Sequence, residues 1–210
     1  NVRAENCHRF ESHVQARAAV LTEPLACVVH AFERLGSVAG LDVLVLGAGA
    51  IGLLSLQVAK LGGADHVSHV DLDLARCEVA KQLGADAVAA SISDLEKDKW
   101  DVVVDATGAV PAIREGLSVI ERGGSFLQIG VSDPHAKVEV SPYEIFAREL
   151  KIVGSLTTEG NFSEAVRLIA SGQVETDLIV GETQALEAVG ELLSTPKKAR
   201  SPKMVVSPKE

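Results

Sequence analysis

The stretch from Val43 to Gly63, VLVLGAGAIGLLSLQVAKLGG, constrains the fold of this chain more than any other part of the sequence. It starts with an apolar run of strand length, passes through a glycine-rich turn, and continues with apolar residues at helical spacing. A strand that is apolar at every position is typical of a parallel sheet covered on both faces. The stretch therefore predicts a buried parallel strand that leads through a tight turn into a helix packed on the sheet.

The same alternation of strand and helix continues along the chain. Apolar runs predict strands at 43–46, 66–70, 87–89, 100–104, 125–129 and 150–153, and helical patterns lie between them, over 51–61, 74–83 and 112–120. Strands separated by helices of about 10–15 residues are typical of βαβ units. Apolar residues make up 47% of the chain, enough for a substantial core. The predicted fold class is α/β, with a doubly wound parallel sheet.

The segments on either side of this region have a different pattern. Residues 1–20 are polar and irregular. A helix follows, with Thr22 as its expected N-cap and Pro24 in its first turn. Two further helices are predicted at 162–170 and 186–193, each followed by a short strand.

The glycine turn has the spacing Gly47-x-Gly49-x-x-Gly52, directly after a strand and at the start of a helix. In such a turn the first glycine permits the tight bend and the second lets the backbone approach a pyrophosphate. The third lets helix and strand pack closely. Backbone amides at the helix start, here those of Ala50 and Ile51, then face the phosphates. A glycine-rich turn without a ligand is the alternative interpretation of this motif alone.

Asp71 ends the second strand, about 20 residues after the third glycine. A carboxylate there accepts hydrogen bonds from the adenosine ribose and repels a 2′-phosphate, so the sequence favours NAD over NADP. The alternative is that Asp71 is a helix N-cap. Arg76 lies five residues later, where it could accept a 2′-phosphate, lie against the adenine or ribose, or be a surface arginine. We expect both residues to contribute to cofactor binding.

The ends of two later strands are expected at the same edge of the sheet. Thr107 follows the fourth strand in the segment Asp105-Ala106-Thr107-Gly108, and Ile129, Gly130 and Val131 close the fifth. Ligands of open α/β sheets lie at the carboxyl ends of the strands, so both segments are predicted to reach the cofactor, the fifth strand nearer the nicotinamide. The alternative for each segment is that its glycine only marks the change from strand to loop.

Charge and cysteine content exclude several classes of protein. The chain has 29 acidic and 20 basic residues, a net charge of −9, which argues against nucleic acid as a partner. Cys7, Cys27 and Cys77 are far apart and form no C-x-x-C pair, so neither a disulfide framework nor a zinc knuckle is indicated. A cytoplasmic setting fits best, and no apolar stretch is long enough to predict a membrane span. The chain begins with Asn1, so we expect it to be a fragment or a processed product.

Taken together, the motifs resemble a known family. LTEPLACVVHAFERLG, the glycine turn, VDLDLARCEVAKQLGAD, DVVVDATGA and GGSFLQIG follow one another in the order and spacing of the medium-chain dehydrogenase/reductase family. The E-P-L-A-x-x-x-H segment is most similar to its zinc-dependent polyol branch, which includes sorbitol and butanediol dehydrogenases.

The resemblance implies a dehydrogenase that transfers hydride between a secondary alcohol and NAD, with a small alcohol or ketone as substrate. It implies an NAD-binding Rossmann domain at 23–155, flanked by parts of a separate catalytic domain at 1–22 and 156–210. It also implies a homo-oligomer. The usual zinc ligands of the family would precede this chain, so we expect zinc in the parent protein, no catalytic residue here, and an inactive fragment.

Glu23 matches the acidic residue of the E-P-L motif, which makes it a weak metal candidate that needs the missing domain. His30 is more simply a packed helix histidine than a ligand, and His66 and His69, which flank the second strand, are interpreted as structural or exposed. One departure is Leu156-Thr157-Thr158, where the polyol branch often has an arginine. Two alternatives stay open, namely a zinc-independent reductase of the same family and a free-standing NAD-binding module.

Overall fold

A six-stranded parallel sheet lies at the centre of the computed structural model, which describes residues 2–4, 7–158, 160–194 and 202–207. The strand order is β3-β2-β1-β4-β5-β6, and all five pairings are parallel. The strands are β1 (Asp42–Leu46), β2 (His66–Val70), β3 (Ala87–Ala89), β4 (Trp100–Asp105), β5 (Ile120–Gln128) and β6 (Lys151–Gly154). This order is that of a doubly wound sheet, so the predicted fold class is confirmed.

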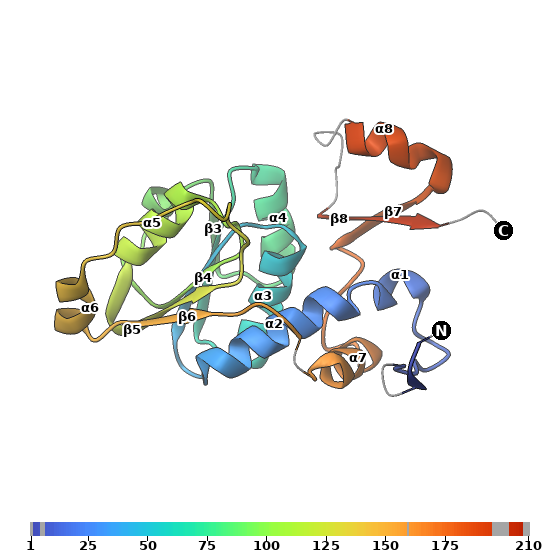
Figure 1. Ribbon diagram of the computed structural model, residues 1–210, viewed down its shortest axis with the longest axis horizontal. Coiled ribbons are helices and arrows are strands. Elements are labelled where there is room, and N and C mark those ends of the chain that lie inside the picture. The colour runs from blue at the N-terminus through green and yellow to red at the C-terminus, as the bar shows by residue number, and fades with distance from the viewer. Residues whose placement is uncertain (1, 5–6, 159, 195–201, 208–210) are drawn as a thin grey trace.

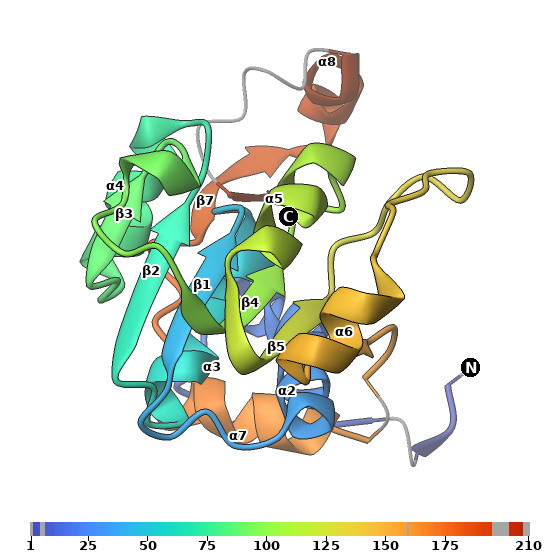
Figure 2. The same ribbon diagram turned by 90° about the vertical axis from the view of Figure 1, so that its left-hand side faces the viewer.

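Helices cover both faces of the sheet (Figures 1 and 2). The helices of the described residues are α1 (Ala16–Ala19), α2 (Thr22–Leu35), α3 (Ala50–Leu61), α4 (Leu74–Gln82), α5 (Val110–Ser118), α6 (Pro142–Arg148), α7 (Phe162–Ala170) and α8 (Val189–Ser194), of which α1 and α8 lie away from the central sheet. Side chains alternate along β1, so Val43 and Val45 join the core under α2 and α3. Leu44 and Leu46 join a second core with Ile113 of α5 on the other face. The continuous apolar strand is thus buried on both sides.

The chain beyond β6 folds away from the central sheet. Helix α7 packs against α2 and contributes Ala165, Leu168 and Ile169 to the core under α2. A separate parallel pair, β7 (Val180–Ala185) and β8 (Lys203–Ser207), lies with α8 at the opposite end of the molecule from α6 (Figure 1). No helix in the described residues has the length and apolar character needed to cross a membrane.

Several local predictions differ from the structure. Leu21, and not Thr22, is the N-cap of α2, because the preceding turn of α1 runs directly into it and the Thr22 hydroxyl donates back to Ala19 O (2.8 Å). Helix α5 begins at Val110, two residues before the predicted start, with Pro111 in its first turn. Strand β5 begins at Ile120, before the predicted start at Ser125, and its register against β4 shifts between Trp100 and Val102. Helix α6 was not predicted.

Candidate cofactor site

A different structural requirement accounts for glycine at each of the three positions of the turn. Gly47 has φ +96°, a left-handed conformation that favours glycine, and a Cβ there would lie 2.7 Å from Thr107 Cγ2. A Cβ on Gly52 would lie 1.7 Å from the carbonyl oxygen of Gly47, so helix and turn could not pack. A Cβ on Gly49 would have no protein atom within 4 Å. Gly47 is therefore required by its backbone conformation and Gly52 by close packing, whereas Gly49 leaves open space in front of α3.

That open space lies at the N-terminus of α3. Gly49 is the N-cap residue and has no side chain to satisfy the first helical amides, and Ala50 and Ile51 are half-buried in the first turn. The first amides of a helix have no partner within the helix, and the helix dipole places partial positive charge there. This combination binds anions such as phosphate. The described residues therefore fit the pyrophosphate of a dinucleotide.

Asp71 is half-buried beside the turn. Its Oδ2 accepts a hydrogen bond from Ala48 N (2.6 Å), and its Oδ1 accepts one from Asp73 N (2.9 Å). The N-cap of α4 is Asp73, which accepts from Ala75 N (3.0 Å), so the alternative of Asp71 as a helix cap is wrong. A carboxylate can accept about four hydrogen bonds, so Asp71 has acceptor capacity left for a ribose hydroxyl.

The Arg76 side chain pairs with Asp73, the N-cap residue of its own helix α4. Its Nε lies 3.9 Å from Asp73 Oδ2, in an ion pair on the surface of α4. The side chain is partly exposed and stays near the end of β2. A role for Arg76 at the adenine or ribose remains a prediction.

A mostly apolar groove of about 340 Å³ opens beside the glycine turn, between the ends of β1 and β2 and helix α5. Its lining comes from four segments, and the apolar residues in it include Leu46, Val70, Ile92, Ala109 and Pro111. A groove with apolar walls and a few polar groups is typical of sites for flat heterocyclic ligands such as adenine. Asp71 lies at its edge, where the ribose of such a ligand would be.

The groove residues that follow β3 and begin α5 were not predicted from the sequence. The signal was available, because a strand had been predicted at 87–89 and the residues after a parallel strand lie at the ligand edge. The position of Ile92 after that strand could therefore have placed it in the site. Pro111 could have been placed in the same way, since it begins the helix that follows the fourth strand.

Asp105, at the end of β4, joins the loops on the far side of the site. The carboxylate is fully buried, and Oδ1 accepts from Thr107 N (3.1 Å) and Thr107 Oγ1 (2.5 Å). Its Oδ2 accepts from Gly108 N (2.9 Å) and Gln128 Nε2 (2.6 Å). The Asp105 carbonyl also accepts from Gly130 N (2.8 Å). One buried side chain therefore fixes the end of β4 against the end of β5.

The predicted nicotinamide-side residues meet at this junction. A Cβ on Gly130 would lie 2.2 Å from Gly108 N, so only glycine allows the two loops to approach so closely. Thr107 is exposed on the site side, Ile129 is half-buried, and the Val131 side chain is 88% exposed. The structure thus brings Thr107 and Gly130 together at the carboxyl edge and leaves Val131 projecting into solvent.

His69 lies inside β2 and is fully buried, so the interpretation that it flanks the strand is wrong. Its Nε2 lies 3.0 Å from Gly47 O, and because a carbonyl only accepts, Nε2 carries the proton. Burial lowers the pKa of His69 to about 4, although the bond to Gly47 and the charge of Asp71 act in the opposite direction. The imidazole is therefore neutral at physiological pH.

This shift predicts that the chain loses stability as the pH falls from about 6.5 to about 4. In that window the unfolded chain binds a proton on His69 that the folded chain does not, so the free energy of unfolding decreases by up to about 3 kcal/mol. Urea unfolding at about pH 7 and about pH 4.5 measures the loss. Because carboxylates also titrate there, the control is His69→Gln, which should have a shallower pH dependence. Equal pH dependence of the two proteins would contradict the prediction.

Glu23 and the histidines do not assemble a metal site. Glu23 is exposed on α2 and accepts a hydrogen bond from the thiol of Cys27 (Sγ to Oε1 3.5 Å). Burial, with the nearby Glu23 charge, raises the pKa of Cys27 to about 11, which disfavours the thiolate that metals bind. His30 is buried in α2. Within the described ranges no group of three or more His, Cys, Asp or Glu side chains could hold a metal, and a catalytic zinc needs three protein ligands.

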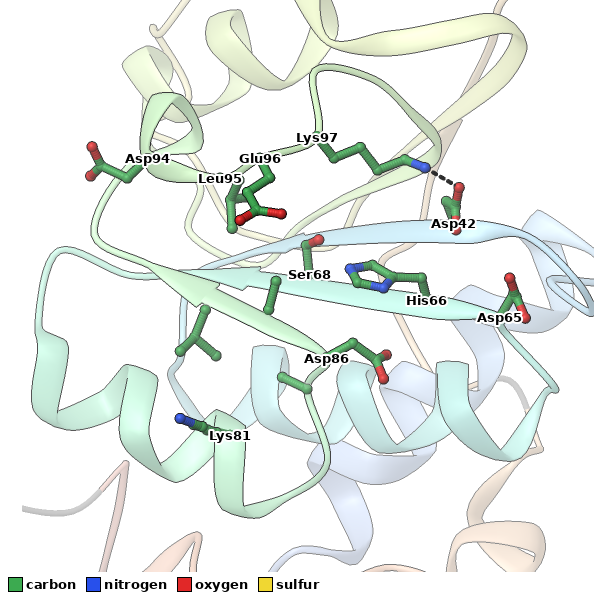
Figure 3. Close-up of a pocket in the computed structure, with 13 residues that line it drawn as sticks. Asp42, Asp65, His66, Ser68, Lys81, Asp86, Asp94, Leu95, Glu96 and Lys97 are labelled. Carbon is green, nitrogen blue, oxygen red and sulfur yellow. Dashed lines mark hydrogen bonds and ion pairs between the residues drawn. The ribbon is translucent and has the colours of Figure 1, made fainter.

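A second hollow, of about 820 Å³, lies at the amino ends of β1, β2 and β3 (Figure 3). Its lining is mostly polar, with more acidic than basic side chains, and Lys97 pairs with Asp42 across it. Lys60 pairs with Asp86 at its rim (2.8 Å). This hollow is at the opposite edge of the sheet from the glycine turn, where open α/β sheets do not bind their cofactors. The candidate site is therefore the carboxyl edge.

The chain is similar to known dehydrogenases. The family model described as zinc-binding dehydrogenase matches residues 50–171. D-altritol 5-dehydrogenase of Agrobacterium fabrum is 35% identical over 185 residues, which cover 85% of this chain and 55% of that enzyme. The chain thus spans about half the length of this curated relative.

Solved structures give the same picture for the fold. A zinc-binding dehydrogenase of Sinorhizobium meliloti 1021, bound to NADP, superimposes with a TM-score of 0.89 at 28% identity, covering 96% of this chain and 62% of that one. Acetophenone reductase of Geotrichum candidum, in complex with NAD, superimposes with a TM-score of 0.83 at 27% identity, covering 97% and 59%. Similar folds therefore hold either dinucleotide, and the residues at the ribose must decide between them.

Proposed function

This chain belongs to the zinc-binding dehydrogenase family, and on that premise we propose that it is the NAD-binding part of an alcohol or polyol dehydrogenase. The parent protein would transfer hydride between a secondary alcohol and NAD, with the nicotinamide supplying the hydride chemistry when bound. The observation that carries the proposal is the glycine turn in front of α3, with open space at Gly49 and the Asp71 carboxylate beside it.

Each part of the carboxyl edge has a role in this proposal. The amides at the start of α3, including those of Ala50 and Ile51, bind the pyrophosphate. Asp71 accepts a ribose hydroxyl, and the apolar groove beside it takes the adenine. The junction of Thr107 and Gly130, held by Asp105, orients the nicotinamide end of the cofactor. These residues bind and position, and the reacting alcohol would be held by the rest of the parent.

We also propose the domain arrangement that the resemblance implies, with the NAD-binding domain at 23–155 and parts of a catalytic domain at 1–22 and 156–210. The packing of α7 on α2 supports a close association of the C-terminal segment with the NAD-binding domain. Catalytic zinc would be held in the parent by residues outside this chain, near Glu23. Metal analysis of the parent and of this chain tests the point, and stoichiometric zinc in this chain alone would contradict it.

The proposal predicts a preference for NADH that depends on Asp71. Fluorescence titration should show that the chain binds NADH about tenfold or more tightly than NADPH, because the carboxylate repels a 2′-phosphate in a partly buried site. Asp71→Asn removes that repulsion but keeps an acceptor for Ala48 N, so the preference should shrink to about threefold or less.

The matched control is Asp73→Asn, which removes the same charge two residues along the chain. Asp73 is exposed and caps α4, and asparagine caps a helix as well as aspartate does. The ratio of NADH to NADPH affinity should therefore stay as in the wild type. Equal affinities of the wild type for NADH and NADPH would contradict the role proposed for Asp71. Failure of the wild type to bind either cofactor would overturn the proposed function.

We propose a homo-oligomer because one edge of the central sheet exposes apolar residues. Strand β6 is the last strand in the order, and Ile152 on it is 47% exposed. Tyr143 and Phe146 of the neighbouring α6 are 71% and 78% exposed. An open apolar strand edge is a template for pairing with another chain. Light scattering at increasing concentration measures the state, and a monomer throughout would contradict the proposal.

We propose a cytoplasmic location from the state of the cysteines. Cys7, Cys27 and Cys77 are all free thiols in the structure, which suits a reducing compartment. Fractionation of cells that express the parent protein tests this, and recovery outside the cytoplasm would contradict it.

A further inference from the structure

The peptide group between Gly47 and Ala48 is held at both of its polar ends by strand β2. His69 Nε2–H donates to the Gly47 carbonyl (3.0 Å), and Asp71 Oδ2 accepts from the Ala48 amide (2.6 Å). His69 and Asp71 are two residues apart on one strand, so their side chains lie on the same face. Between them, Val70 O accepts from Gly47 N (2.7 Å). Three successive residues, the last two of β2 and Asp71 directly after it, therefore hold one turn of backbone.

We propose that His69 is a positioning residue for cofactor binding, which together with Asp71 fixes the plane of the Gly47–Ala48 peptide so that the following amides of α3 face the pyrophosphate. This inference rests on the proposed function and adds to it a residue that makes no contact with the cofactor. We call this arrangement, formed by His69, Asp71 and the Gly47–Ala48 peptide, the peptide clamp.

A clamp is needed at this peptide because glycine rotates easily. Gly47 has φ +96° and, with no Cβ, can populate several backbone conformations of similar energy. In the observed orientation its carbonyl points under α3, where the closely packed Gly52 leaves space only for hydrogen. Rotation of the peptide would move the carbonyl oxygen away from His69 and the amide away from Asp71. A carbonyl turned toward the anion side would repel phosphate, whereas the clamp keeps it on the protein side.

Packing alone does not explain a histidine at this position. The side chain is fully buried in a strand whose neighbours Val67 and Val70 are apolar, and an aliphatic residue would fill such a place without a desolvation cost. Among the described residues no partner is found for its buried Nδ1, so only one of its polar atoms is satisfied. What histidine provides, and an aliphatic residue cannot, is the Nε2–H donor to Gly47 O.

Because Asp71 has two roles in the proposed site, the peptide clamp has a second consequence. The same carboxylate that is proposed to accept the ribose hydroxyl also holds the Ala48 amide, so the ribose and pyrophosphate subsites share one side chain. Restraint of the turn by His69 should therefore affect ligands that contain a pyrophosphate more than ligands that contain only the nucleoside. This difference separates positioning from general stabilisation.

The test compares ADP, which carries a pyrophosphate, with adenosine, which does not. In His69→Leu the donor is removed from a side chain of similar size, and affinity for ADP and NADH should fall about tenfold or more. Adenosine affinity should stay within about twofold of the wild type. His69→Gln keeps an N–H donor and should recover most of the ADP affinity. Calorimetry measures ADP and NADH, and an NMR titration measures adenosine.

Ser68→Ala is the matched control, since Ser68 is the buried polar neighbour on the opposite face of β2, where it accepts from Trp100 Nε1 (3.1 Å). Its loss should reduce stability and leave the ratio of ADP to adenosine affinity unchanged. An unchanged ratio in His69→Leu, or a ratio altered equally in Ser68→Ala, would overturn the inference. If His69→Leu does not fold, His69→Asn serves instead, because its amide is too short to reach Gly47 O.

A measurement without ligand separates this inference from the proposed function. Hydrogen exchange of the Ala48 amide should be about tenfold faster, or more, in His69→Leu than in the wild type, relative to amides in β4. Unchanged exchange would overturn the clamp even if NADH binds. Failure of the wild type to bind NADH or ADP would overturn the proposed function, whatever the exchange rate of Ala48.

Discussion

Replacement of Gly52 by alanine is expected to disrupt the glycine turn and to weaken NADH binding strongly. The new Cβ would lie 1.7 Å from the carbonyl oxygen of Gly47 and 2.9 Å from its carbonyl carbon. Both are backbone atoms of Gly47, whose carbonyl oxygen is bonded to His69 and whose amide is bonded to Val70 O, so a shift of this residue would strain or break these hydrogen bonds. Overpacking in a tight core costs about 1–3 kcal/mol, and the backbone contact here places Gly52→Ala at or above the upper value.

Urea unfolding and NADH titration measure the two effects of Gly52→Ala. We expect the free energy of unfolding to fall by about 3 kcal/mol or more. NADH affinity should fall about 100-fold, because α3 can no longer present its first amides at the same place. A Gly52→Ala variant with the stability and NADH affinity of the wild type would contradict both the packing and the site.

Gly49→Ala is the matched control for the same turn. Gly49 has φ −76°, which alanine adopts readily, and a Cβ there would meet no protein atom within 4 Å. Stability should therefore change by less than about 0.5 kcal/mol, or rise slightly through the lower entropy of the unfolded chain. NADH affinity should still fall by about tenfold, since the methyl group occupies the space assigned to the pyrophosphate. Full NADH affinity in Gly49→Ala would place the pyrophosphate elsewhere.

The strands and the glycine turn could be predicted because their signals are local. Apolar runs such as VLVL and VVV can only be satisfied between two helical layers, and β1 and β4 lie at the centre of the sheet as those runs require. Each glycine of the turn has its own structural explanation, namely backbone conformation at Gly47, open space at Gly49 and close packing at Gly52. Such features depend on a few neighbouring residues, so the sequence contains most of the information about them.

Features that arise from several segments were not predictable in the same way. The apolar groove beside the glycine turn combines residues at or after the ends of β1, β2, β3 and β4. Helix α6 is short and has no long apolar face that would mark it in the sequence. His69 is the clearest case, because neither of the two histidines in HVSHV stands in a motif that would mark its role. Its role becomes visible only when β2 is placed beside the turn that follows β1, since the contact joins residues 22 positions apart.

Replacement of Asp105 by alanine is expected to have the second large effect, because one buried carboxylate accepts hydrogen bonds from both strand ends of the site. Removal leaves the amides of Thr107 and Gly108 without their acceptor, and the side-chain amide of Gln128 loses one of its two acceptors. Hydrogen bonds to a charged group contribute about 1.5–3 kcal/mol each, and unsatisfied buried donors cost about 1–3 kcal/mol. Partial relaxation and water entry reduce the sum, so we expect a loss of about 3–5 kcal/mol in the free energy of unfolding.

Asp101→Ala separates this effect from the loss of any carboxylate on β4. Asp101 lies at the other end of the same strand, is half-buried, and accepts from Asp42 N (2.9 Å). Its removal should cost about 1 kcal/mol and leave NADH affinity unchanged. In Asp105→Ala, by contrast, NADH affinity of the folded protein should fall about tenfold, because the loop that holds Thr107 loses its link to Gln128 at the end of β5 while the pyrophosphate subsite stays intact. ADP, which does not reach that junction, should bind Asp105→Ala as it binds the wild type. Equal losses for NADH and ADP would mean that Asp105 supports the whole edge and not the nicotinamide side.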